Sequence, residues 1–99
     1  MRLRANHDIA RRLDEVAGLL HEQGASPFRV SAYRRGAETV RHLEVPVQQV
    51  LEDGGLRGLD ELPGIGEGLA FAIEALIRTG RLPLLDRLTV DIAGYQPYW

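Results

Sequence analysis

Residues 59–73, Leu-Asp-Glu-Leu-Pro-Gly-Ile-Gly-Glu-Gly-Leu-Ala-Phe-Ala-Ile, constrain the fold of this chain more than any other stretch. Pro63 and Gly64 break a helix, so a first short helix is expected to end just before them. Ile65 is expected to plug the turn into the core, and Gly66 to open a second helix. The apolar residues of that second helix recur at helical spacing: Leu69, Ala70 and Ile73.

Two helices joined by such a turn are typical of a helix-hairpin-helix motif, which offers backbone amides to a nucleic-acid phosphate. Gly64 permits a turn conformation that a side chain would strain. Gly66 allows a phosphate oxygen to approach the unpaired N–H groups at a helix start. An ordinary corner between helices, capped by Pro-Gly, is the alternative interpretation. The predicted phosphate-contacting residues are Gly64, Ile65, Gly66, Glu67 and Gly68.

The composition predicts one small domain without a membrane segment. Ninety-nine residues support a single modest core, and no apolar run reaches the roughly 18 residues that a membrane helix needs. The first residues lack the apolar stretch of a signal peptide, and the chain has no cysteine, which fits the cytoplasm. The three histidines lie far apart in sequence, so we expect them at the surface rather than on a metal.

All twelve basic residues are arginines, and the formal net charge is −2. A slightly acidic protein needs a local basic face to bind nucleic acid. One candidate face falls within a short stretch that contains Arg29, Arg34, Arg35 and Arg41. Acidic residues flank the turn and would oppose phosphate binding there: Asp60, Glu61 and Glu67.

The chain is expected to be all-α, a compact bundle of four to five short helices that contains one helix-hairpin-helix. Asn6 is expected to cap the first helix, and Ser26-Pro27 to start the second. On the second helix Arg34 and Glu38 are four residues apart and are expected to pair. The predicted helical ranges are 6–24, from 27 onward with Val30, Tyr33, Ala37 and Val40 on one face, 47–52, 56–61 and 66–79, followed by a short helix or turn over 82–88.

Residues 1–88 are therefore expected to form the domain, and residues 89–99 a separate C-terminal tail. The tail holds Tyr95, Tyr98 and Trp99 in a short stretch that also contains a glycine and a proline. Two interpretations stay open for it. It is a frayed end, or it is an aromatic strap against the bundle or a partner.

Three motifs stand together in this chain: Ile-Ala-Arg-Arg-Leu from Ile9, Pro-Phe-Arg-Val-Ser-Ala-Tyr-Arg-Arg from Pro27, and Leu-Pro-Gly-Ile-Gly from Leu62. With them, the stretch from Asn6 to about Leu88 resembles the small N-terminal, lyase-type domain of X-family DNA polymerases such as DNA polymerase beta. It is also similar to related stand-alone bacterial helix-hairpin-helix proteins. The resemblance implies a compact four-helix domain that holds gapped or nicked DNA near a 5′-phosphate.

In that family the domain can also be a lyase, whose lysine forms a Schiff base with an abasic sugar. The position of this lysine corresponds to Ala72, and that of a phosphate-binding lysine to Gly68. Arginine cannot replace the nucleophile, because its guanidinium stays protonated. The α-amino group of Met1 is the one remaining amine, and nothing in the sequence puts it in a pocket. We therefore expect no enzyme activity and no catalytic residue.

The resemblance also implies roles for residues at the start of the second helix. Arg29 and Tyr33 match positions that hold the 5′-phosphate, and Phe28 matches a position that stacks on a template base. We expect Arg34 nearby. Tyr33 also fits the core, because it shares a face with apolar residues, and Arg29 also fits a solvated helix start. No cofactor is expected to be required, but similar hairpins bind Na⁺ or K⁺ through turn carbonyls, here those of Asp60, Leu62 and Ile65.

Two functions stay open at this point. The first is DNA binding without sequence preference through the hairpin, at 5′-phosphate ends of gapped or nicked DNA in repair and without lyase chemistry, with room for a protein partner in a repair complex. The second is a protein-interaction domain that keeps the fold but has lost useful DNA affinity. The acidic net charge and the position of Glu67 favour the second.

Overall fold

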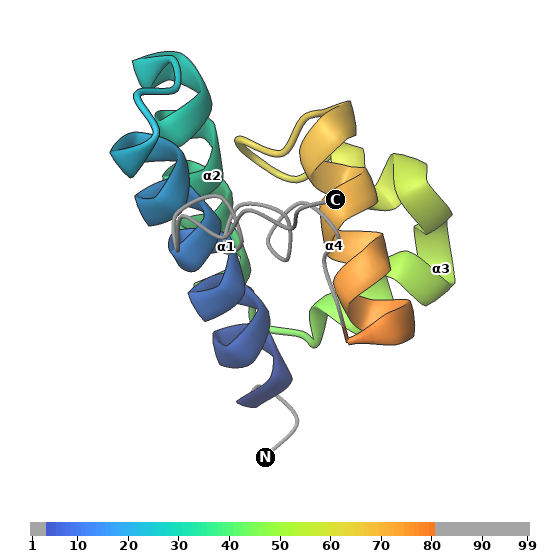
Figure 1. The fold of residues 1–99 in the computed structure, drawn as a ribbon. Coiled ribbons are helices and arrows are strands. Elements are labelled where there is room, and N and C mark those ends of the chain that lie inside the picture. Colours follow the sequence, from blue (N-terminus) through green and yellow to red (C-terminus); the bar gives the residue numbers. More distant parts are fainter. Residues whose placement is uncertain (1–3, 81–99) are drawn as a thin grey trace, which may run out of the picture.

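The structure, a computed structural model, describes residues 4–80. They form four helices, α1 (Arg4–Glu22), α2 (Pro27–Arg41), α3 (Val47–Asp60) and α4 (Glu67–Thr79), as Figure 1 shows. The predicted all-α fold is confirmed. The short helix or turn expected over 82–88 and the tail over 89–99 lie outside the described residues. Within 4–80, no helix is long and apolar enough to cross a membrane.

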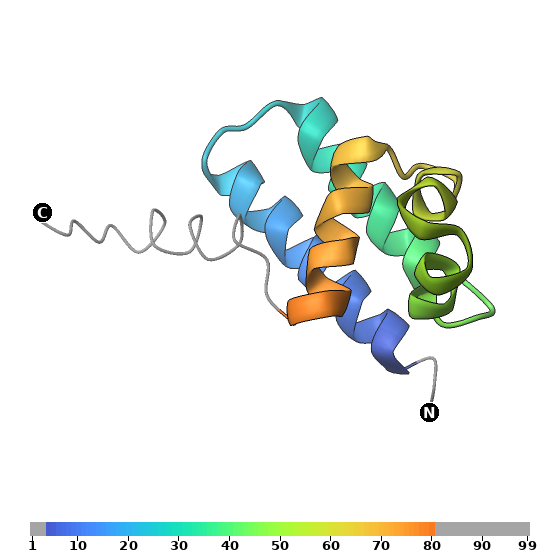
Figure 2. The same ribbon diagram turned by 90° about the vertical axis from the view of Figure 1, so that its right-hand side faces the viewer.

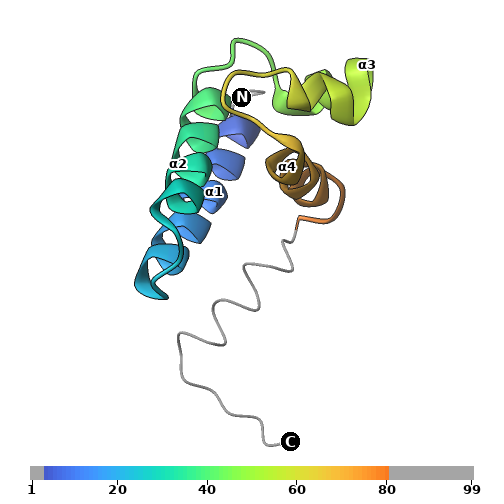
Figure 3. The same ribbon diagram turned by 90° about the horizontal axis from the view of Figure 1, so that it is seen from above.

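The four helices form two pairs. Helices α1 and α2 pack along their length, and α3 and α4 form the second pair (Figures 1 and 2). Helix α4 contacts both α1 and α2, so it joins the two pairs, with α3 on its outer side in the view of Figure 3. The site described below lies where the start of α4 meets α2.

The core follows the helical spacing of the sequence. On α2 the four residues expected on one face are all buried, which confirms that prediction. The apolar side chains of one pair pack on those of the other, because each helix has one apolar stripe to remove from water. The largest fully buried apolar side chains are Leu13, Val16, Val40, Val47, Leu59 and Ile73.

Glycines and a serine set the helix ends largely as expected. The Oγ of Ser26 accepts the N–H of Phe28 at 3.2 Å and caps α2. Helix α4 ends at Thr79, and the residue that caps it, Gly80, has φ 73°. Gly55, with φ 64° and ψ −157°, breaks the helical conformation inside α3. The two short helices expected around it are therefore present as one element with a kink.

The expectation that Asn6 caps the first helix is wrong. Helix α1 begins at Arg4, and Asn6 lies inside it with a fully buried side chain. Its Oδ1 accepts the N–H of Val47 at 2.7 Å, and its Nδ2 donates to the carbonyl of Val45 at 2.8 Å. Asn6 thus caps the start of α3 from across the fold. Burial of the amide is tolerated because both of its ends are hydrogen-bonded.

The expected pair between Arg34 and Glu38 is also absent. Glu38 lies 3.5 Å from a guanidinium nitrogen of Arg41 and 3.3 Å from Nδ1 of His42. Arg41 also binds Asp14 at 2.7 Å, and this contact links α2 to α1. Within the described part of the chain Arg34 makes no ion pair, so its charge is available to solvent or a ligand.

Candidate nucleic-acid interface

The hairpin turn between α3 and α4 is held closed by its own backbone. Gly64 has φ 76°, a conformation that glycine adopts without strain. The next residue, Ile65, donates its N–H to the carbonyl of Leu62 at 3.0 Å, and only 4% of its surface is exposed. Ile65 therefore plugs the turn into the core, as its position between two glycines suggested. The N–H groups of Leu62 and Ile65 are therefore already used within the turn, whereas those of Gly64 and Gly66 have no backbone acceptor among residues 4–80.

Helix α2 fixes the position of this turn. The hydroxyl of Thr39 donates to the carbonyl of Pro63 at 2.6 Å. A Cβ added at Gly64 would lie 3.2 Å from Cδ of Arg35, so the Arg35 side chain runs directly beside the turn. The turn is thus docked on α2 by one hydrogen bond and one packed arginine.

The start of α4 offers unpaired backbone amides. Its N-cap is Gly66, and the first hydrogen bond of the helix runs from the N–H of Ala70 to the Gly66 carbonyl at 2.9 Å. Within residues 4–80, the N–H groups of Glu67, Gly68 and Leu69 consequently have no backbone acceptor. A Cβ added at Gly66 or Gly68 would meet nothing within 4 Å, so the approach to these amides is open.

A surface groove joins these amides to α2. Its lining combines glycines of the hairpin with one arginine and one tyrosine of α2, which are one helical turn apart. The full lining is Arg29, Ala32, Tyr33, Gly64, Gly66, Gly68 and Leu69. The fold therefore brings together two sets of predicted contact residues that are more than thirty positions apart in the sequence.

Tyr33 satisfies both roles that the sequence left open for it. Its relative exposure is 9%, so most of the ring belongs to the core, yet it also lines the groove. Burial raises the pKa of the phenol above its ordinary value of 10.0. The Arg29 guanidinium opposes that shift through its charge and a side-chain hydrogen bond. Tyr33 is thus a protonated phenol at neutral pH, and it lines the groove together with Arg29.

The other predicted residues of α2 lie outside the groove lining. The ring of Phe28 is 87% exposed at the start of α2, next to Arg29, with its face open to solvent. Arg34 is exposed as well. Arg35 and Thr39 contact the turn, although the sequence did not predict this role for either residue. Their spacing of four with Gly36 between them was a usable signal, because it puts all three on adjacent positions of one helix.

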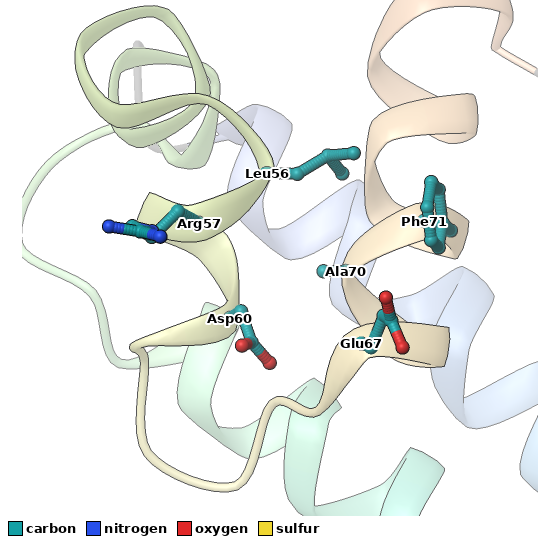
Figure 4. A pocket seen from close by; sticks show the side chains of 6 residues that line it. All are labelled: Leu56, Arg57, Asp60, Glu67, Ala70 and Phe71. Carbon is teal, nitrogen blue, oxygen red and sulfur yellow. The ribbon is translucent and has the colours of Figure 1, made fainter.

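The acidic side chain at the motif does not line the groove. Glu67 lies between Gly66 and Gly68 in sequence, but its carboxylate lines a separate pocket with Asp60 and Phe71 (Figure 4). Among the residues that the structure describes, the groove is therefore lined by one cation and no carboxylate. The electrostatic repulsion of a bound phosphate by Glu67 is therefore weaker than the sequence suggested.

The expected cation ligands are backbone oxygens of the turn. The Leu62 carbonyl already accepts the N–H of Ile65, which leaves one lone pair free for a cation. In the described ranges, no group of three or more His, Cys, Asp or Glu side chains is arranged to hold a metal ion. A monovalent cation at the carbonyls of Asp60, Leu62 and Ile65 stays a prediction.

The two positions that correspond to family lysines differ in their surroundings. The methyl group of Ala72 is buried, with 7% of the residue exposed, inside the core of α4. Gly68 lines the groove itself. With no lysine in the sequence, neither position offers an amine to a substrate.

These features define a class of domain: two helices joined by a glycine turn, docked on a preceding pair of helices. The family model described as a helix-hairpin-helix domain matches residues 4–82, and the chain belongs to this family. It is also 30% identical over 88 residues to the DNA polymerase/3'-5' exonuclease PolX of Bacillus subtilis (strain 168). That match covers 86% of this chain and only 14% of the relative's length. The resemblance to X-family polymerases is thereby confirmed.

Proposed function

We propose that this domain binds DNA through backbone phosphates, without sequence preference, in the groove between α2 and the start of α4. One observation carries the proposal. Free amides of α4 and the guanidinium of Arg29 share a single groove, although they come from distant parts of the chain. A relative named as a DNA polymerase and exonuclease supports DNA as the nucleic acid.

The chemistry of the groove suits a phosphate. The amides of Glu67, Gly68 and Leu69 point out of a helix start, where the helix dipole also favours an anion. Arg29 adds a planar pair of donors that matches two phosphate oxygens. None of these groups reads a base edge, which is why we expect no strong sequence preference.

The proposal includes gapped or nicked DNA in repair as the substrate, with a preference for a 5′-phosphate end. Tyr33 supports it, because a protonated phenol beside Arg29 adds one more donor to the same groove. We propose no lyase chemistry, since the chain lacks a lysine and the position of the family nucleophile is the buried Ala72. A Na⁺ or K⁺ ion at the turn carbonyls would neutralise part of the phosphate charge.

Titration of labelled gapped DNA at two salt concentrations, followed by fluorescence anisotropy, tests the proposal. We expect a Kd of roughly micromolar or weaker that rises with salt, with a slope for a few phosphates. Gly66→Val should abolish binding. The backbone of Gly66 has φ −97° and ψ −176°, which valine adopts freely, and the added atoms enter open space in front of the amides.

Gly18→Val is the matched control, because a Cβ at Gly18 also meets nothing within 4 Å but lies on α1, outside the groove. Circular dichroism should show that both variants remain helical. Binding that is insensitive to salt, or that survives Gly66→Val at full strength, would refute the proposed phosphate site. Absence of binding to gapped, nicked and single-stranded DNA at low salt would favour a protein-interaction domain instead.

A further inference from the structure

A second pocket opens between α3 and α4 and shares no residue with the groove. Its volume is about 360 Å³. It is lined by Leu56, Arg57, Asp60, Glu67, Ala70 and Phe71, whose side chains are drawn in Figure 4. The proposed phosphate and cation sites use backbone atoms of Glu67 and Asp60, but none of the side chains that line this pocket.

The apolar part of the pocket is open to solvent. Phe71 is 51% exposed although it lies in the middle of α4, and Leu56 is half-buried on the facing helix. The large hydrophobic side chains exposed in residues 4–80 are Phe28, Val45 and Phe71. Of these three, Phe71 lines the pocket between α3 and α4. An apolar group of a ligand can therefore be buried against its ring.

The charged part of the pocket carries two free carboxylates. Asp60 and Glu67 are exposed, and within the described residues neither forms an ion pair. Figure 4 shows the Glu67 carboxylate directed toward Phe71, whereas the guanidinium of Arg57 points away from that ring. A cation over an aromatic ring and beside two carboxylates is favoured by both. The same carboxylates repel phosphate, so nucleic acid and anionic lipid are poor occupants.

We propose that this pocket docks a segment of a partner protein that presents an apolar side chain and, one helical turn away, a lysine or arginine. The apolar side chain would lie against Leu56 and Phe71. The basic group would lie beside Asp60 and Glu67. Such a segment matches both the exposed apolar side chains and the negative charge of the pocket. The proposal does not depend on DNA binding at the other face.

An NMR titration of the ¹⁵N-labelled full chain tests the inference. The probe is a capped, alanine-rich helical peptide of about 18 residues with leucine and arginine four residues apart on one face. Two matched peptides carry glutamate in place of arginine and alanine in place of leucine. We expect saturable shifts centred on Leu56, Ala70 and Phe71 with the first peptide, and at least a threefold weaker Kd with each of the others.

Variants of the protein locate the contact. Phe71→Ala should weaken binding about tenfold, and Glu67→Gln about two- to fivefold. The fold should remain, because Glu67 is exposed and Phe71 is half-exposed. Glu22→Gln removes an exposed carboxylate at the end of α1 and should change nothing. The inference is wrong if the peptide causes no saturable shifts at millimolar concentration. It is equally wrong if the glutamate peptide binds as well, or if Phe71→Ala leaves the affinity unchanged.

Discussion

The hydroxyl of Thr39 donates a 2.6 Å hydrogen bond to the carbonyl oxygen of Pro63, and this contact docks the hairpin turn on α2. Close by, a Cβ added at Gly36 would overlap Cδ2 of Leu69, so the lack of a side chain there lets α2 and α4 approach closely. The two contacts together explain why Arg29 and the amides of α4 face one groove. The candidate site is thus a product of the contact between helix pairs rather than of the hairpin alone.

Loss of the Arg29 guanidinium should erase any preference for a phosphorylated DNA end. A terminal phosphate carries close to two charges, against one for an internal phosphate. The wild type should therefore prefer a 5′-phosphate gap to a 5′-hydroxyl gap by up to about tenfold, or ~1.4 kcal/mol, and Arg29→Ala should bind both alike. Competition titrations with the two ends measure this. Equal affinity of the wild type would mean that Arg29 is a solvated residue at a helix start.

No covalent adduct should form with an abasic 5′-deoxyribose-phosphate substrate under borohydride. A Schiff base needs a free amine, and the chain has no lysine side chain. Denaturing gels of labelled substrate measure trapping, and a lysine-dependent lyase serves as the positive control. A trapped species would contradict the expectation, and its location by mass spectrometry would decide whether the α-amino group of Met1 is the nucleophile.

Removal of the Asn6 side-chain amide should destabilise the fold more than removal of an exposed amide of similar size. Asn6→Ala leaves the buried N–H of Val47 without its partner and also removes the part-buried hydrogen bond to the carbonyl of Val45. We expect a loss of about 2–4 kcal/mol in the free energy of unfolding, measured by urea denaturation. Gln49→Ala removes an exposed hydrogen bond to Asp53 and should cost less than about 0.5 kcal/mol. Equal losses for the two variants would show that water replaces the buried amide.

Two helical glycines should respond in opposite directions to the same substitution. Gly18→Ala fills open space on α1 and should stabilise the protein by about 0.5–1 kcal/mol through helix propensity. Gly36→Ala drives a methyl group into Leu69 and Ile65, so overpacking of about 1–3 kcal/mol should outweigh the same propensity gain. Thermal or urea unfolding of both variants measures the contrast. Stabilisation by both would show that α2 and α4 separate at little cost.

Burial of Tyr33 should make the fold sensitive to alkali. Its pKa in the folded protein is raised above 10.0, so the folded state favours the protonated phenol. The stability gained in this way is complete below pH 10.0 and is lost as pH rises through the pKa of the folded state. Tyr33→Phe should therefore lose less stability than the wild type above that pH. Urea unfolding at several pH values gives the free energy of unfolding of each protein as a function of pH. The same decrease with pH in both proteins would contradict the prediction.

The parts of this fold that the sequence predicts are those that depend on local chemistry. The glycine turn, the Ser26 cap and the buried face of α2 follow from neighbouring residues alone, and the structure confirms them. The capping role of Asn6 could not be predicted, because its partners lie about forty residues away. The side of α4 that Glu67 takes likewise depends on how α3 packs, which no local pattern specifies.

The groove has one wall on each helix pair, and this has a consequence for the energetics of the whole domain. A ligand that contacts both Arg29 and the start of α4 holds the two helix pairs together. Its binding free energy then adds to the cohesion of the folded state, so saturation should raise the melting temperature. A substitution that separates the helix pairs near Gly36 lowers the fraction of molecules with an assembled groove, and the apparent ligand affinity falls by that fraction. Ligand affinity and the stability of the fold are therefore linked through the packing of the two helix pairs.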